Sequence, residues 1–508
     1  MTDNLILAGE APAGAIPAPA PSPIPVTSPF PVTSPVPVTA GVADDPAGAL
    51  ARMVIETPYE AIPAAVIALA KRAILDTLSV LIAGSSWEVV PGIVDLVAEW
   101  GGAEQGTVLV YGHRVPAPMA AFANGVMARA IDMGDVHETG GHVTEWNVPT
   151  MLSALGLADR PVTGREFLAA YVTGAELSVR CSAALNMPRY QPVAGIPGEW
   201  YGSLCSAASV SRMLGRSVDE TWNALGICYS VHSLSEHSKY AEGTQMARVQ
   251  HSFAGDTAIK AVLLTRRGVT GPRGIFRGEP AGILRHVGWD DVNPERLTDG
   301  LGTRWHLAEG LSMKPYPACK FTHSFIASTI TLMQRHAIDH RMIARIDAVG
   351  SNGARMTFEP AQAKWHPVTV PEAMFSAPYA IATAAIEQRF FLDDLHPAEI
   401  ARADKRALME RIHITFDAAN PQEFEGFPVA ITLRDGTVHR CTTPFTKGHT
   451  DNPFSTQDQI AKLAACARFA AVPFADERLA ELVRLCGDLE HVPDMQAVVD
   501  VLTPGRGA

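Results

Sequence analysis

Apolar residues recur at helical spacing over most of the first half of the chain. In residues 62–84 they fall three or four positions apart, which predicts a long amphipathic helix. The Thr-Pro-Tyr-Glu of residues 57–60 predicts a capping box at the start of this helix. Similar boxes at residues 163–166 and 217–220 predict the starts of two more helices. We therefore expect residues 50–285 to be almost entirely helical.

Strand-like alternation replaces this pattern after the Lys-Pro-Tyr-Pro that begins at Lys314. Residues 344–349 and 411–416 alternate between apolar and polar side chains, which predicts two strands. Further along, Asp435 and Gly436 separate two alternating runs, and an Asp-Gly pair in this position favours a tight β-hairpin turn. This part of the chain is therefore predicted to contain a sheet.

Helical spacing also occurs between and after these strands. Residues 377–388 and 397–411 follow it, and it returns from Ser455 onward. We therefore predict a mostly α fold with an α+β part, in which a large all-helical domain built from two chain segments carries an inserted α+β lid domain. The predicted boundaries are 1–45 for a Pro-rich tail, 46–312 for the first helical segment, 313–454 for the α+β lid domain and 455–505 for the second helical segment.

The first 45 residues have a composition of their own. Between residues 11 and 43 the chain is almost entirely Pro, Ala, Val, Thr, Ser and Gly, and a Pro-Val-Thr-Ser-Pro motif recurs there. We expect an extended, disordered tail. The tail lacks the charged start and the uninterrupted apolar stretch of a secretory signal. No part of the sequence contains a run of about 18 uninterrupted apolar residues, so no transmembrane helix is predicted.

Charge and cysteine content narrow the possible partners and the compartment. The 508 residues include 41 basic and 53 acidic side chains, a formal net charge of −12. This balance argues against nucleic acid or a membrane surface as a partner. The seven cysteines are scattered and never spaced as CxxC. They predict a cytoplasmic protein with neither a disulfide framework nor a zinc knuckle.

The densest group of polar side chains lies in residues 124–142, at the end of a run with helical apolar spacing. Glycines in this segment allow the backbone to leave the helix and turn. Three interpretations of the group stay open: capping of a helix end, a metal site without regular ligand spacing, or general acid/base catalysis. Its members are Asp132, Asp135, His137 and His142.

The order of these and other motifs resembles the MmgE/PrpD family, which includes 2-methylcitrate dehydratase, cis-aconitate decarboxylase and iminodisuccinate epimerase. The resemblance covers about residues 46–500. The matching segments include Asn124-Gly125, the run from Asp132 to His142, Leu75-Asp76-Thr77, Arg248-Val-Gln-His251, Lys314-Pro-Tyr-Pro-Ala-Cys319 with His323, and Pro453-Phe-Ser455.

The resemblance implies a cofactor-independent enzyme with a helical domain, an α+β lid and a cleft between them. It implies a lyase or isomerase that transfers a proton at a carbon beside a carboxylate or carbonyl group of a small molecule. A homodimer is expected, with no cofactor, no metal, no nucleic acid and no membrane partner. The catalytic candidates are Asp132, His142, His137, Asp135 and Tyr201. The substrate-binding candidates are Arg248, Lys314, His251, His323 and Lys239.

Three positions depart from the family pattern. Val136 stands where cis-aconitate decarboxylases have threonine, Tyr201 where the family often has histidine, and Ala247 where many members have lysine. We therefore expect a non-standard substrate, such as a secondary metabolite in a biosynthetic reaction. Two alternatives stay open. One is a primary-metabolism enzyme like cis-aconitate decarboxylase or 2-methylcitrate dehydratase, and the other is a non-catalytic scaffold or binding protein that uses the Pro-rich tail.

Overall fold

The computed structural model describes most of the chain beyond the N-terminal segment. The described residues are 45–139, 141–185, 201–231, 244–277, 282–286, 292–420 and 424–503. The tail predicted for residues 1–45 lies outside them, apart from Asp45. No helix in these ranges combines the length and the apolar character that crossing a membrane requires. All seven cysteines are free, as the sequence predicted.

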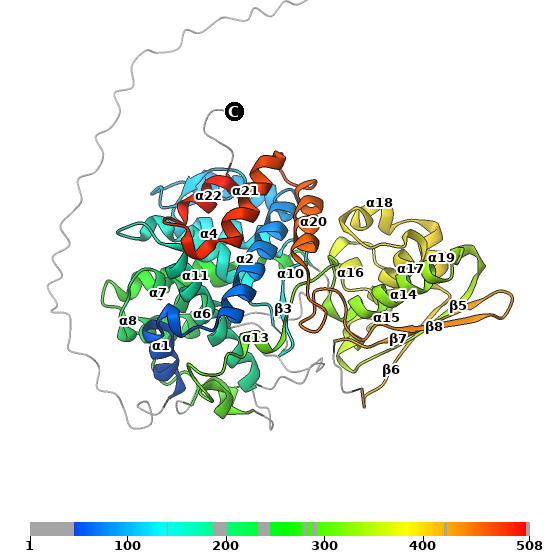
Figure 1. Cartoon of the computed structure of the whole chain (residues 1–508), viewed down its shortest axis with the longest axis horizontal. Coiled ribbons are helices and arrows are strands. Elements are labelled where there is room, and N and C mark those ends of the chain that lie inside the picture. Colours follow the sequence, from blue (N-terminus) through cyan, green and yellow to red (C-terminus); the bar gives the residue numbers. More distant parts are fainter. Residues whose placement is uncertain are drawn as a thin grey trace, which may run out of the picture. The chain divides into compact units, whose positions relative to one another are not determined.

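Helices form the larger part of the described chain (Figure 1). The central helix is α2, which is apolar on nearly every side and is buried without interruption over its last three turns. Helix α6 packs on α7, α4 on α5, and α11 on both α4 and α7. The helices before the lid are α1 (Pro46–Glu56), α2 (Ala64–Gly84), α3 (Val90–Trp100), α4 (Ala117–Arg129), α5 (Thr144–Ser153), α6 (Gly164–Leu185), α7 (Tyr201–Met213), α8 (Val218–Val231), α10 (Met246–Val249), α11 (Ser252–Thr265), α12 (Ile283–His286) and α13 (Leu307–Gly310).

Two of the three predicted capping boxes are confirmed. At the start of α6, Glu166 accepts the Thr163 backbone N–H, while Thr163 Oγ1 accepts the Glu166 backbone N–H. Ser217 and Glu220 make the same reciprocal pair at the start of α8. These residues satisfy amide donors that the first helical turn leaves unpaired.

The capping box predicted at residues 57–60 is wrong. Helix α1 ends at Glu56, and α2 begins only at Ala64, directly after Pro63. Glu60 pairs with Arg165 instead of capping a helix. Proline disfavours helical backbone in the residue before it, so the chain cannot run as one helix through Pro63.

The lid region contains the predicted sheet. Strand β5 (Ile343–Gly350) lies parallel to β6 (Ile412–Phe416) and antiparallel to β7 (Pro428–Leu433), which pairs with β8 (Val438–Thr442) in the order β6-β5-β7-β8. The β7–β8 hairpin is confirmed, and Gly436 in its turn has a φ of 90°, which glycine adopts most readily. The lid helices are α14 (His323–Arg335), α15 (Ala361–Trp365), α16 (Val370–Met374), α17 (Ala377–Glu387), α18 (Pro397–Ile400) and α19 (Ala403–Met409).

The single helix predicted for residues 397–411 is instead two short ones, α18 and α19. Arg402 between them has extended backbone, with φ −58° and ψ 129°. Its guanidinium pairs with Glu387, Glu399 and Asp404, which lie on both sides of the break. These ion pairs hold a corner that the apolar spacing alone does not reveal.

The chain then returns to the helical part. Helices α20 (Thr456–Ala467) and α21 (Asp476–Gly487) pack on α2, and α22 (Gln496–Leu502) packs on α21. Figure 1 shows these late helices beside the early ones. The mostly α fold with an α+β part is therefore confirmed. The boundaries drawn at residues 312 and 454 stay a prediction.

Candidate active site

A loop between α4 and α5 carries the acidic residues that the sequence singled out. Asp132 has a φ of 45°, a backbone conformation that is uncommon for a residue with a side chain and is often found at functional sites. Beyond it, the short strand β3 (Val136–His137) pairs with β4 (Leu311–Ser312). Because β4 ends two residues before Lys314, this pairing brings Asp132 and Lys314 together.

Asp132 is enclosed by two cations. Lys314 Nζ donates to Asp132 Oδ1 at 2.9 Å, and Arg129 Nη1 donates to the same oxygen at 2.6 Å. Burial alone would raise the pKa of Asp132, but Lys314 and Arg129 outweigh burial and hold that pKa well below its usual value. Asp132 therefore stays ionised at neutral pH, which suits it to orienting Lys314 better than to accepting a proton.

His142 lies against this ion cluster. Its Nε2 is 2.9 Å from Arg129 Nη1, and its Nδ1 is 2.8 Å from the backbone oxygen of Asp135. Because arginine can only donate and a carbonyl can only accept, we assign the proton to Nδ1 and the lone pair to Nε2. The lone pair of His142 thus faces the positive charges beside Asp132.

A second imidazole belongs to a carboxylate–histidine pair. Glu145 Oε1 lies 2.7 Å from His251 Nδ1, and both side chains are buried. Burial opposes the ionisation of Glu145, but Arg129, His142 and His251 together lower its pKa to about 2. The ionised carboxylate fixes Nδ1 as the donor, so Nε2 of His251 is the nitrogen that can exchange a proton with a substrate.

The two imidazoles are neighbours. The ring centroids of His142 and His251 are 5.9 Å apart, and the ring of Trp146 lies 5.2 Å from that of His251. The ring centroids of Tyr201 and Trp146 are 6.0 Å apart, and the two rings are nearly perpendicular. A Cβ at Gly141 would come within 1.8 Å of the Tyr201 hydroxyl, so only glycine fits in front of this phenol. Tyr201 therefore packs directly on the loop that carries His142.

Asp135 lies next to the site, but its hydrogen bonds hold the local backbone in place. Its carboxylate accepts the backbone N–H and the hydroxyl of Thr144, the first residue of α5. Tyr171 extends this network, with its hydroxyl 2.7 Å from that of Thr144. Burial raises the pKa of Asp135 to about 7. These bonds anchor the start of α5, which positions Glu145 in its first turn.

His137 is not brought into the cluster. Its Nδ1 accepts the backbone N–H of Thr139, and its Nε2 donates to the backbone oxygen of His306. Burial lowers the pKa of His137 to about 4. A neutral imidazole with both nitrogens engaged by the backbone stabilises the β3 region rather than moving protons.

Two further substrate-binding candidates, Arg248 and His323, have partners of their own within the chain. Arg248 pairs with Glu88 and has Met374 Sδ 3.6 Å from its Nη2, and burial lowers its pKa to about 10. His323 Nε2 donates to the Ala318 backbone oxygen at 3.0 Å, and burial lowers the pKa of His323 well below its usual value. Lys239 lies outside the described residues.

Sequence reasoning did not assign roles to Arg129 and Glu145. Arg129 lies three residues before Asp132, and Glu145 lies three residues after His142, a spacing that places side chains on one helical face. That spacing is the feature of the sequence from which the two residues could have been identified. Lys462, which supports the site from α20, has no local signal at all.

Lys462 ties three distant segments together. Its Nζ donates to Asp76 Oδ1 at 2.7 Å, to the Met133 backbone oxygen at 3.0 Å and to the Lys314 backbone oxygen at 2.8 Å. Asp76 lies on α2, Met133 follows Asp132, and Lys314 carries the ammonium that bonds Asp132. The buried Lys462 side chain therefore holds the two halves of the Asp132–Lys314 pair in register.

Replacing Lys462 by methionine is expected to lower the free energy of unfolding by about 3–5 kcal/mol, because Asp76 is left buried without its partner. Urea titration measures the loss. The double variant Lys462→Met/Asp76→Asn removes the unpaired charge and should recover part of it. Lys447→Met, which removes an exposed lysine paired with an exposed aspartate, is the control and should change little. Equal stability of Lys462→Met and the wild type would contradict this role.

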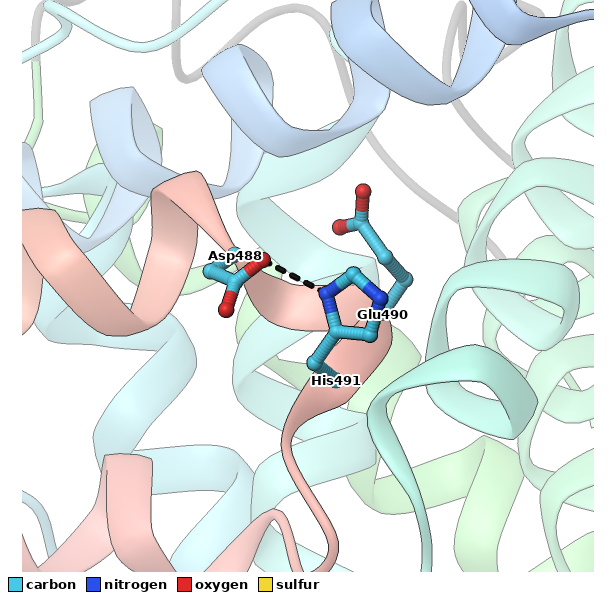
Figure 2. Close-up of side chains that lie close together, drawn as sticks. All are labelled: Asp488, Glu490 and His491. Carbon is cyan, nitrogen blue, oxygen red and sulfur yellow. Dashed lines mark hydrogen bonds and ion pairs between the residues drawn. The ribbon is translucent and has the colours of Figure 1, made fainter.

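The geometry around Asp132 does not support the metal site that was one interpretation of the polar residues 132–142. The Asp132 carboxylate already faces two cations, which disfavours a bound metal ion. Among the described residues, the side chains spaced for metal binding are Asp488, Glu490 and His491 near η8 (Leu489–His491), shown in Figure 2. There His491 Nδ1 bonds Asp488 at 2.6 Å, while Glu490 pairs with Lys71 at 2.9 Å. These three side chains, of which Glu490 is half-buried, form surface ion pairs.

Known proteins share both parts of this architecture. The model of the MmgE/PrpD N-terminal domain matches residues 48–295, and that of the MmgE/PrpD C-terminal domain matches residues 316–487. The cis-aconitate decarboxylase-like protein oryM of Aspergillus oryzae is 24% identical over 473 residues, which cover 89% of this chain and 96% of that protein. The cis-aconitate decarboxylase of Homo sapiens is 24% identical over 447 residues, which cover 86% and 90%. That of Aspergillus terreus is 24% identical over 238 residues, which cover 45% and 48%.

Proposed function

Because this chain belongs to the MmgE/PrpD family, we propose that it is a lyase that acts on a small carboxylate by proton transfer at the carbon beside the carboxylate group. Its similarity to cis-aconitate decarboxylases supports lyase chemistry. The observation that carries the proposal is the buried cluster in which Asp132 binds two cations, His142 contacts one of them, and the ring of His251 lies beside that of His142. A cytoplasmic homodimer stays a prediction.

The cations account for substrate activation. Loss of a proton or of carbon dioxide beside a carboxylate leaves negative charge that spreads onto the carboxylate oxygens. Lys314 and Arg129 are buried, so their charges act on such a group through a low effective dielectric. Asp132 keeps both cations in place without itself changing protonation state. We assign Asp132 an orienting role and Lys314 the stabilising role.

The imidazoles account for proton transfer. Glu145 orients His251 and stabilises its protonated form, which makes His251 Nε2 a suitable proton acceptor or donor. The Nε2 lone pair of His142 accepts a hydrogen bond from Arg129, so His142 can take a substrate proton once Arg129 donates to the substrate carboxylate instead. A lyase needs one group to remove a proton and another to deliver one, and these two histidines can divide those tasks.

The departures from the family pattern bear on the substrate. Val136 and Ala247 are both buried, and neither side chain can hydrogen-bond a carboxylate. A substrate with fewer or differently placed carboxylates than the usual family substrates would fit these changes. We therefore retain a non-standard carboxylate as the proposed substrate, with cis-aconitate and 2-methylcitrate as the reference compounds.

The proposal is tested by incubating the full chain with cis-aconitate, 2-methylcitrate and a panel of unsaturated and hydroxylated di- and tricarboxylates in deuterated water. Proton NMR should show product formation or incorporation of deuterium beside a carboxylate for at least one compound. Lys314→Met, purified in parallel, corrects for contaminating enzymes. If no compound shows turnover or exchange above the level of that variant, the lyase proposal fails.

A further inference from the structure

Five lysines are buried in the part of the chain that the structure describes. Four of them pair with a carboxylate: Lys314 with Asp132, Lys320 with Glu425, Lys405 with Glu399 and Lys462 with Asp76. Lys364 on α15 is the fifth, with 3% of its surface exposed. Its ammonium has no carboxylate of the described residues within ion-pairing distance.

The surroundings of Lys364 do not neutralise it. Its Nζ lies 5.6 Å from the centroid of the Phe375 ring, which offers a cation–π contact. Glu372 is close enough to attract the Lys364 ammonium electrostatically. Its carboxylate, however, accepts hydrogen bonds from the backbone N–H groups of Val368 and Thr369 and forms no ion pair with Lys364. Burial lowers the pKa of Lys364 to about 8. A buried ammonium without a counter-ion is costly, so the site favours an anion from outside the chain.

Lys364 is linked to the candidate active site through neighbouring lid residues: its Nζ contacts the Phe375 ring, and Met374, the residue before Phe375, has its Sδ 3.6 Å from Arg248 Nη2. The Cys319 thiol lies within electrostatic reach of Asp132, Lys314 and Lys364 together. The Cys319 backbone N–H donates to the Met374 oxygen at 3.0 Å, so this segment is joined to the turn before Phe375. This backbone bond connects the turn that contacts Lys364 to the segment that begins at Lys314.

The charges of the site are otherwise balanced. Arg129 and Lys314 are matched by Asp132 and Glu145, and Arg248 by Glu88. Lys364 is the excess positive charge. A second carboxylate of a bound substrate would neutralise the positive charge of Lys364.

We propose that Lys364 is a substrate-binding residue of the lid, which binds a carboxylate remote from the reacting carbon. The inference rests on the proposed function, because it places Lys364 in the same site and assigns to it a second carboxylate of the substrate proposed there. The first carboxylate binds at Lys314 and Arg129, and the second binds at Lys364. Binding of the second carboxylate joins the lid to the helical part through the substrate.

Direct binding tests this without any turnover. Isothermal titration of the full chain with propane-1,2,3-tricarboxylate, a saturated compound that cannot react by elimination, measures the affinity. Lys364→Met should weaken binding about 10- to 100-fold, as expected for loss of a charge-assisted hydrogen bond. Lys364→Arg keeps the charge and should retain most of the affinity. Lys447→Met, the surface control, should bind like the wild type. Acetate, with one carboxylate, should bind equally to wild type and Lys364→Met.

Thermal melting of the same variants separates binding from folding. Lys364→Met removes an uncompensated buried charge and should melt at or above the wild-type temperature. A markedly lower Tm would show that the ammonium stabilises the fold, and it would overturn the proposal. Unchanged tricarboxylate affinity in Lys364→Met would overturn it as well, and so would inorganic phosphate binding as tightly as the tricarboxylate. Because these readouts need no catalysis, tricarboxylate binding that depends on Lys364 would stand even if the lyase assay failed.

Discussion

Replacing Lys314 by methionine is expected to lower kcat/KM by about 10³-fold on any substrate that the chain turns over. The Lys314 ammonium is buried and bonded to Asp132 at 2.9 Å, where it can stabilise negative charge on the substrate carboxylate in the transition state. Methionine has a similar length and no charge. Steady-state kinetics with the most active compound of the carboxylate panel measures the loss.

A double variant separates chemistry from folding in this experiment. Lys314→Met leaves Asp132 with Arg129 as its remaining cation, so the Tm should fall. Lys314→Met/Asp132→Asn restores the charge balance, and its Tm should rise again while kcat/KM stays low. Recovery of activity together with stability would show that Lys314 is structural and would contradict the assigned role.

Replacing Glu145 by glutamine is expected to lower kcat about 10²- to 10³-fold, with a smaller change in KM. Glutamine keeps the shape of the side chain but removes the charge that orients and stabilises protonated His251. Since burial and its cationic neighbours leave the pKa of Glu145 at about 2, the carboxylate is ionised throughout the range from pH 5 to 9. Its own titration therefore does not shape the pH profile in that range.

Thermal melting gives this prediction a second readout. Glutamine has the same shape as glutamate and can still bond His251, so the Tm of Glu145→Gln should fall much less than its kcat. Glu481→Gln, which removes an exposed carboxylate of a surface ion pair, is the control and should leave both kcat and the Tm unchanged. A loss of kcat that is matched by a large loss of Tm would argue that Glu145 only supports the fold.

Local sequence patterns predicted the elements that depend on near neighbours. The boxes at Thr163 and Ser217 and the turn at Gly436 were confirmed, because each rests on bonds or backbone angles within a few residues. The box at residues 57–60 was wrong because Pro63 overrides it. The split between α18 and α19 was missed because ion pairs of Arg402, one of them with Glu387 fifteen residues away, hold the corner.

The sequence by itself also determined which residue types gather near the helix end at Asp132, and that His142 belongs with them. Only the tertiary structure decided what each one does. Lys314 joins Asp132 across 182 residues, and Lys462 joins Asp76 across 386. A carboxylate's protonation state depends on such distant cations and on burial, which no local pattern contains. The same reason explains why Lys364 looked ordinary in the sequence: its lack of a counter-ion exists only in the folded chain.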